Sequence, residues 1–277
     1  MGERPIQQKH MKSLRLRTVD GFEIAVVTHG RADQDVAVWM HGITVDKDEY
    51  LGLYLDGAEF LEERGIASVR FDFRGHGDSS GTPGDFTVVG QNLDLRAVLD
   101  YVATKFGGPN VRIHLIGSSF GAPPAIFAAY RYKEQIASLC LIAPVLSYQR
   151  TFIHPETEWA QEIFSIKNLK GLDKKGRICF DKTFCVGHQL VEEMHIIDPS
   201  TALSQVRQRT LIFHGDKDSM VPYAATRQAC RGLRHVHFVT LKNTDHGYTV
   251  VGDDDGDAPA TLRNKASIFR SIAGHIR

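Results

Sequence analysis

The hydrophobic and polar residues of this chain follow two alternating spacings. Nearly continuous apolar runs, typical of buried strands, span residues 36–40, 66–73, 111–116, 136–145, 210–214 and 236–241. Apolar residues recur every three or four positions, as on amphipathic helices, over residues 50–61, 87–106, 122–130, 223–231 and a last helix ending near 275. This alternation predicts an α/β fold with a mostly parallel sheet, because parallel strands need crossovers that place helices on both faces.

One segment, residues 147–206, breaks the alternation. It mixes Trp159, Phe164 and Met194 with charged runs, and its 60 residues are too many for an unstructured loop in a compact domain. We therefore expect an inserted cap at 147–206 over a cleft, with the core formed by residues 1–146 and 207–277. About the first 12 residues are expected to be frayed.

The composition excludes several classes of protein. The 33 lysine and arginine residues balance 33 aspartate and glutamate residues, so no overall positive charge favours nucleic acid or an anionic membrane. No apolar run approaches the roughly 18 residues of a membrane-spanning helix, and the first residues lack the apolar segment of a secretory signal. We expect a cytoplasmic protein without a membrane span or a nucleic-acid partner.

The cysteines bear on the redox state and on metal binding. The chain has Cys140, Cys179, Cys185 and Cys230, and no two of them form a C-x-x-C pair. Their scatter favours reduced, partly buried thiols over a disulfide framework or a zinc site. We therefore expect free thiols and no metal.

The strongest chemical signal is a G-x-S-x-G sequence at residues 117–121, between a predicted strand and a predicted helix. In this context a tight turn holds the central serine, Ser119, in a strained conformation with its hydroxyl clear of the sheet. The flanking glycines have a steric reason, because a Cβ atom there would collide with the neighbouring strand or helix. Ser118 is the competing hydroxyl, but both glycines are centred on Ser119. The alternative is a glycine-rich crossover whose serine only caps the helix.

A serine nucleophile needs an imidazole to accept its proton and a carboxylate to orient the imidazole, here in the chain order serine, acid, histidine. Among 13 histidines, His246 lies in the loop after the last predicted strand, whereas His41 and His214 end strands just before glycine turns. Asp216 and Asp218 share one turn after the preceding strand, and either could reach an imidazole.

Two backbone amides are candidates for an oxyanion hole. The amide of Phe120 directly follows the nucleophile, and the amide of Ile43 follows the first buried strand. A plain turn at 41–43 is the alternative interpretation.

Taken together, these motifs resemble the α/β-hydrolase superfamily, most closely its bacterial cinnamoyl/feruloyl esterase-like and monoacylglycerol lipase-like branches, from about residue 20 to residue 272. The similar segments are HGIT at 41–44 with Lys47, FDFRGHGDS at 71–79, the serine turn, HGxxDxxVPY at 214–223 and DHG at 245–247. The resemblance implies an α/β-hydrolase fold with an inserted cap. It also implies that Asp218 is the acid, with Asp216 as the fallback, and that 71–79 is a structural glycine loop.

One motif departs from that branch. Its serine turn commonly reads G-H-S-Q-G, whereas Ser118 and Phe120 stand beside the nucleophile here. The backbone amide at 120 is independent of the side chain, so hydrolysis is still expected. Substrate preference does not carry over, because a phenyl ring near the acyl pocket replaces a polar side chain, and no motif in the cap identifies substrate-binding residues.

These features predict a serine hydrolase that cleaves a small-molecule carboxylic ester through an acyl-enzyme. His246 would deprotonate Ser119, the amides of Phe120 and Ile43 would stabilise the oxyanion, and Asp218 would hold the imidazole. No cofactor is expected. The same residues could serve a thioesterase, lactonase, amidase, peptidase or acyltransferase, and a protein of this fold could also be a non-catalytic ligand-binding receptor.

Overall fold

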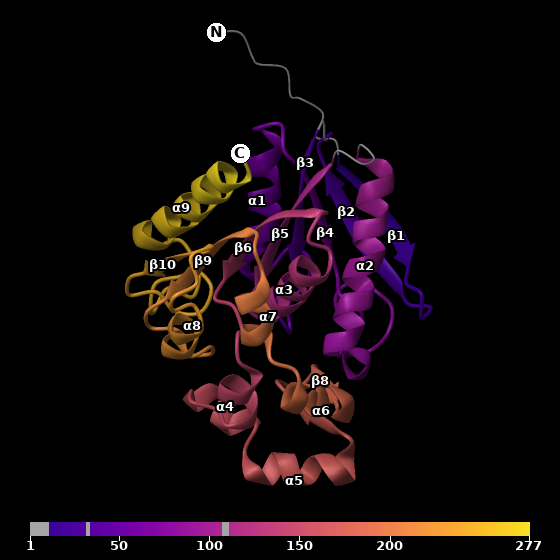
Figure 1. Cartoon of the computed structure of the whole chain (residues 1–277). Helices are drawn as coiled ribbons and strands as arrows, with labels where there is room; N and C mark the ends of the chain where they lie inside the picture. The colour runs from indigo at the N-terminus through magenta and orange to yellow at the C-terminus, as the bar shows by residue number, and fades with distance from the viewer. Residues whose placement is uncertain (1–10, 32–33, 107–110) are drawn as a thin grey trace.

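One central sheet determines where the other elements lie. Its strands are β1 (Met11–Arg17), β2 (Glu23–His29), β3 (Asp35–Met40), β4 (Ala67–Phe71), β5 (Arg112–Ser118), β6 (Ile136–Ile142), β9 (Arg209–Gly215) and β10 (Val236–Leu241). The computed structural model describes residues 11–31, 34–106 and 111–277, and in them these strands run in the order β1-β2-β4-β3-β5-β6-β9-β10 (Figure 1). All neighbours from β4 to β10 are parallel, whereas β1 and β2 are antiparallel. The predicted mostly parallel sheet is confirmed.

Helices cover both faces of this sheet, as predicted. They are α1 (Leu53–Glu62), α2 (Val88–Lys105), α3 (Ala122–Arg131), α4 (Glu158–Ile163), α5 (Ile166–Lys175), α6 (His188–Ile196), α7 (Pro199–Gln205), α8 (Tyr223–Ala229) and α9 (Pro259–Ile276). Side chains of β3 alternate between two cores: Val38 and Met40 pack with α2 and α3, whereas Trp39 packs with α1 and α9. Burial on both faces explains why this strand reads as a continuous apolar run.

The N-terminal hairpin was missed from the sequence. Strand β1 begins at Met11 and pairs with β2, so Met11 and Lys12 are in a strand and the expectation of a frayed end is wrong for them. Residues 1–10 lie outside the described residues, as do residues 107–110, which follow the helix expected over 87–106. The side chains of β1 are exposed or half-buried at the sheet edge, so this strand has no continuous apolar run to reveal it.

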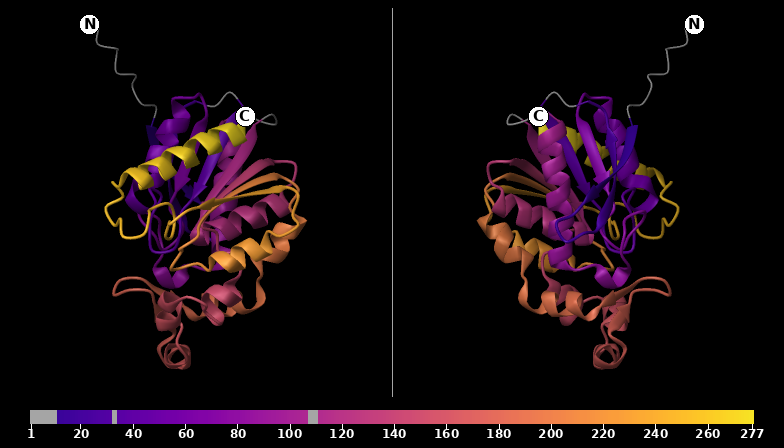
Figure 2. Two further views of the ribbon diagram at one scale, coloured as in Figure 1. Left: turned by 90° about the vertical axis from the view of Figure 1, so that its left-hand side faces the viewer. Right: turned by 90° about the vertical axis from the view of Figure 1, so that its right-hand side faces the viewer.

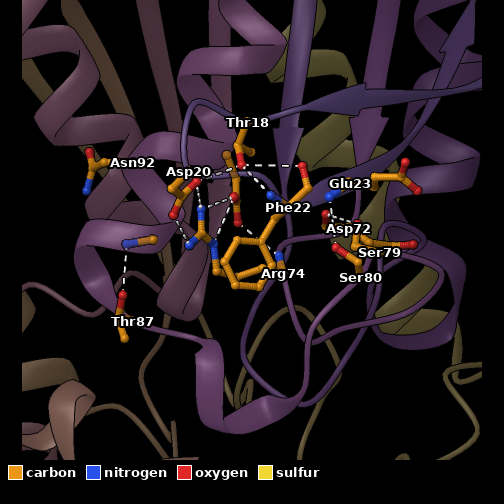
Figure 3. A network of polar contacts seen from close by, with 12 residues as sticks. Thr18, Asp20, Phe22, Glu23, Asp72, Arg74, Ser79, Ser80, Thr87 and Asn92 are labelled. Carbon is orange, nitrogen blue, oxygen red and sulfur yellow. Dashed lines mark hydrogen bonds and ion pairs between the residues drawn. The ribbon is translucent and has the colours of Figure 1, made fainter.

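The loop at 71–79 fastens this hairpin to the sheet. The guanidinium of Arg74 donates to both carboxylate oxygens of Asp20, at 2.7 and 3.1 Å, and to Oδ1 of Asp94 on α2, at 2.8 and 3.0 Å (Figure 3). Its backbone N–H donates to the other oxygen of Asp94 at 2.9 Å. In the same loop, Asp72 accepts from the backbone N–H and the Nζ of Lys47. The loop therefore connects the turn between β1 and β2, helix α2 and the loop that follows β3.

The segment at 147–206, which we call the cap segment, lies between β6 and β9. It contains α4 to α7 and a two-stranded hairpin of β7 (Arg177–Cys179) and β8 (Cys185–Gly187). Helices α4, α5 and α6 gather at one end of the molecule, beyond the sheet (Figures 1 and 2). Glu193 of α6 fastens the segment to the core, because its carboxylate accepts from the N–H groups of Val88 and Val89 at the start of α2, at 2.6 and 3.2 Å.

One expectation about the cysteines is wrong. Cys179 and Cys185 form a disulfide, whereas Cys140 and Cys230 are free and buried as expected. The two bridged residues are cross-strand partners in the β7–β8 hairpin. Spacing along the chain does not reveal this pairing, because residues six apart come face to face only once the hairpin has formed.

Candidate active site

Ser119 occupies a sharp turn between a strand and a helix. It follows β5 directly, opens the turn at 119–121 that leads into α3, and has a φ of 48°, in the left-handed region that costs energy for a residue with a Cβ. A Cβ at Gly121 would collide with the carbonyl oxygen of Met40 on β3, and one at Gly117 would collide with the backbone of Gly121 and Ala122. The steric reason predicted for the two glycines is therefore confirmed.

The turn after β9 and the loop after β10 bring an acid and an imidazole together. Nδ1 of His246 lies 2.9 Å from Oδ2 of Asp218, and Oδ1 of Asp218 accepts from the N–H groups of Met220 and Val221 at 2.9 and 2.8 Å. Asp216, the fallback acid, instead accepts from the N–H of Asn243 and pairs with a surface lysine.

Burial and charge act in opposite directions on this pair. Burial raises the pKa of the Asp218 carboxyl, but the charge of His246 and hydrogen bonds from His214 and His246 hold it well below its usual range. Burial lowers the pKa of His246, but the charge and hydrogen bond of Asp218 and the charge of Glu49 raise it above its ordinary value. The pair can therefore stabilise a positive imidazolium next to an ionised carboxylate.

Ser119 and His246 line the same cavity, which has a volume of about 330 Å³. Its wall combines loops of the core with two aromatic residues of the cap segment, and includes Ile43, Glu49, Ser118, Ser119, Phe152, Trp159 and His246. The cap segment thus supplies part of the surface that a ligand would meet.

The two residues whose amides are expected to form an oxyanion hole both belong to loops or turns that follow strands of the sheet. Ile43 lies in the loop after β3 and lines the cavity, and Phe120 follows Ser119 directly. Among the backbone hydrogen bonds that the described residues form outside helices and strands, none has the N–H of Ile43 or Phe120 as its donor. The neighbouring amide of Gly42 differs, because it donates to Glu49 at 2.9 Å.

The ring of Phe120 lies behind the cavity, against Phe152, which lines it. It is completely buried and packs against Phe86, Tyr148 and Phe152, with ring centroids 5.5, 5.3 and 5.5 Å away. Of these packed rings, Phe152 lines the cavity, so the ring of Phe120 contributes to the wall only through its contact with Phe152.

Sequence reasoning missed two polar residues at this site. Glu49 lines the cavity, and its carboxylate accepts from the N–H groups of Gly42 and Tyr50; burial raises its pKa, an effect that these hydrogen bonds offset in part. Nε2 of His214 lies 3.0 Å from Oδ2 of Asp218. No motif marks Glu49, and His214 was set aside as a residue fixed before a glycine turn.

The described residues contain neither a metal-binding cluster nor a membrane-spanning helix. No group of three or more histidine, cysteine, aspartate or glutamate residues in 11–31, 34–106 and 111–277 is arranged to hold a metal ion. Over the same ranges, none of the helices combines the length and apolar character that crossing a bilayer requires.

The sheet order, the serine turn after β5 and the helices on both faces define an α/β-hydrolase fold. The family described as serine aminopeptidase S33 matches residues 32–170, half of the 277-residue chain, and the chain belongs to this family.

Curated proteins similar in sequence to this chain are named as different kinds of hydrolase. The chain is 27% identical over 194 residues to the mitochondrial palmitoyl-protein thioesterase ABHD10 of Mus musculus, covering 68% of this chain but only 61% of that protein. It is 24% identical to the proline iminopeptidase PfmaB of Pestalotiopsis fici, covering 85% of this chain and 94% of that protein.

Solved structures of low identity share the fold. Est1E from Butyrivibrio proteoclasticus with ferulic acid bound superimposes with a TM-score of 0.74 at 21% identity, over 95% of this chain and 99% of that one. The Pyrococcus furiosus esterase Pf2001 gives a TM-score of 0.68 at 19% identity, over 97% and 95% of the two chains.

Proposed function

We propose that this protein is a serine hydrolase that cleaves carboxylic esters with small acyl groups, with Ser119 as the nucleophile. The observation that carries the proposal is that His246, which is paired with the buried side chain of Asp218, lines the same cavity as the strained Ser119. A serine alcohol is a poor nucleophile near neutral pH, and such a pair is the arrangement that activates it.

In this proposal, each residue of the site has one role in the hydrolysis of the ester. His246 accepts the proton of Ser119 as the hydroxyl attacks the ester carbonyl, and the N–H groups of Ile43 and Phe120 donate to the oxyanion. His246 then protonates the departing alkoxide and later activates the water that releases the acid. Asp218 holds the imidazole throughout, and its ionised carboxylate stabilises the imidazolium that forms.

The cavity favours a small substrate without a carboxylate. Its volume of about 330 Å³ lies at the lower end of the roughly 300–1,000 Å³ that ligand pockets span. Its lining includes the aromatic rings of Phe152 and Trp159 and no lysine or arginine that would pair with a substrate carboxylate. These properties support a short acyl or aromatic ester over a long-chain palmitoyl group, although ABHD10 is named for palmitoyl-protein thioesterase activity.

The test compares p-nitrophenyl esters from C2 to C12, methyl ferulate, a palmitoyl thioester and proline p-nitroanilide. We expect the short esters to give the highest kcat/KM, and Ser119→Ala to lower kcat by roughly 10⁴-fold or more with an unchanged circular dichroism spectrum. Ser118→Ala is the matched control, because it removes the adjacent hydroxyl that lines the same cavity, and it should retain most of the activity.

A fluorophosphonate probe separates the remaining outcomes. It should label the wild type and Ser118→Ala but not Ser119→Ala. Labelling of Ser119→Ala would assign the nucleophile elsewhere, and preferred cleavage of the thioester or the anilide would replace the ester assignment. Ligand binding without labelling or turnover would make the protein a receptor.

A further inference from the structure

The carboxylate of Asp218 is contacted by two imidazoles. Oδ2 lies 2.9 Å from Nδ1 of His246 and 3.0 Å from Nε2 of His214, while Oδ1 accepts from two backbone N–H groups of its own turn. An ionised carboxylate offers about four acceptor positions, so all of them are filled. Three of the four donors have evident roles, since two form the turn and one belongs to the candidate base. His214 is the donor without an assigned role.

The surroundings of His214 determine which of its nitrogens carries the proton. Nε2 faces only acceptors, Oδ2 of Asp218 and, at 3.3 Å, the carbonyl oxygen of Val221. Nδ1 is buried and has no hydrogen-bond partner among the described residues. Hydrogen on Nδ1 would be a buried donor without an acceptor, which is costly. Hydrogen on Nε2 therefore fits the site.

The groups packed around His214 come from three elements. Its side chain is completely buried, with Tyr223 of α8 edge-on at 5.6 Å and Phe238 of β10 stacked at 6.5 Å between ring centroids. The Tyr223 hydroxyl contacts Thr240 and accepts a hydrogen bond from Arg227. The positive charge of Arg227 therefore faces this hydroxyl and not the imidazole of His214. Asp218 is the charged group in direct contact with the imidazole. His246 lies on the other side of Asp218, and the charges of Glu49 and Asp245 raise the pKa of His246.

We propose that His214 is a positioning residue for the hydrolytic reaction: by donating Nε2–H to Asp218 Oδ2, it shares the carboxylate charge with His246 and thereby sets the pH at which His246 becomes a base. This inference rests on the proposed function, because it assigns Asp218 and His246 their roles in hydrolysis. His214 does not touch the cavity and acts only through Asp218.

The sign of the effect follows from the charge on Oδ2. A hydrogen bond from His214 neutralises part of that charge, so it weakens the attraction that raises the pKa of His246. Removing the donor leaves more charge facing His246 and raises the pKa of His246 further. More of the imidazole is then protonated at acidic pH and unable to accept the serine proton.

The first experiment measures kcat/KM against pH for the best p-nitrophenyl ester with His214→Phe, which keeps an aromatic ring against Phe238 but has no donor. Because kcat/KM reports ionisation in the free enzyme, its acid limb should move to higher pH. We expect the loss at pH 5.5 to exceed the loss at pH 8 by about threefold to fivefold, the factor that one net hydrogen bond is worth. A purely structural role would lower kcat/KM by the same factor at both pH values.

Two further variants fix the interpretation. His214→Gln carries a donor near the position of Nε2 and should restore the acid limb toward that of the wild type. Glu49→Gln keeps an acceptor for Gly42 but removes a charge that raises the pKa of His246, so its acid limb should move in the opposite direction, to lower pH. An unchanged acid midpoint in His214→Phe, or no restoration by His214→Gln, would overturn the proposal.

A measurement on the wild type covers the case in which His214→Phe does not fold. In ¹⁵N-histidine NMR, His214, assigned by the resonance missing from His214→Gln, should show the tautomer protonated at Nε2. The opposite tautomer would overturn the proposal without any variant activity. If Ser119→Ala kept full activity while His214 showed the expected tautomer, the proposed function would fail but the contact with Asp218 would stand.

Discussion

The core and the cap segment hold their residues of the candidate active site by different kinds of contact. In the core, Asp218 is held by four donors, two of them backbone N–H groups, and Gly121 packs against the carbonyl of a neighbouring strand. In the cap segment, Phe152 and Trp159 line the cavity. Their rings pack against each other and against Phe180, at centroid distances of 5.9 to 6.5 Å.

This difference separates the fixed part of the site from the adaptable part. Backbone amides and charge-assisted hydrogen bonds are directional, so they hold the candidate triad within the small tolerances that proton transfer needs. Contacts between rings tolerate small shifts, because several tilted arrangements of two rings are nearly equal in energy. We therefore expect changes in the core to alter kcat, and changes in the cap segment to alter which acyl group is accepted.

The largest expected effect is in the core. Asp218→Asn removes the charge that stabilises the imidazolium and should lower kcat by about 10⁴-fold, measured on a short p-nitrophenyl ester. Asp216→Asn is the matched control in the same turn, and it should stay within about twofold of the wild type, as surface substitutions usually do. The reverse ranking of the two variants would make Asp216 the acid.

A smaller effect is expected from the cap segment. Trp159→Ala removes an aromatic wall of the cavity and should lower kcat/KM for a hexanoyl ester by about tenfold, mostly through KM, the loss expected from roughly 1–2 kcal/mol of apolar contact. The acetyl ester should change much less. Tyr130→Ala, which truncates an exposed ring on α3, is the control and should leave both esters unaffected. An equal loss for both esters would contradict the division between core and cap segment.

The smallest effect on activity is expected from the disulfide. Cys179→Ser/Cys185→Ser opens a loop with a sequence separation of six, and should lower the free energy of unfolding of the cap segment by about 2 kcal/mol. Hydrogen exchange at 177–187 should rise, and the hexanoyl ester should lose less activity than in Trp159→Ala. Dithiothreitol should reproduce these changes in the wild type and have no effect on the double variant. Sensitivity of the double variant to dithiothreitol would assign the effect to another target.

Most strands of the core could be predicted because both of their faces are buried, although the buried strand β2 was also missed. Strand β3 is buried on both sides and reads as a continuous apolar run, whereas β1 lies at the sheet edge with exposed side chains and was missed. The disulfide was missed for a related reason, since the pairing of Cys179 with Cys185 depends on a hairpin that no periodicity marks.

By itself the sequence determined the α/β architecture, the steric need for glycines around Ser119 and the order of the candidate residues along the chain, because local spacing encodes these properties. The residues alone left Asp216 and Asp218 open, and the family resemblance favoured Asp218, which the structure places in contact with His246. Only the tertiary structure decided that His214 shares the same carboxylate and that Glu49 reaches the cavity. These contacts join residues from separate loops. Their distances depend on how parallel strands align at one sheet edge, and no local pattern records that alignment.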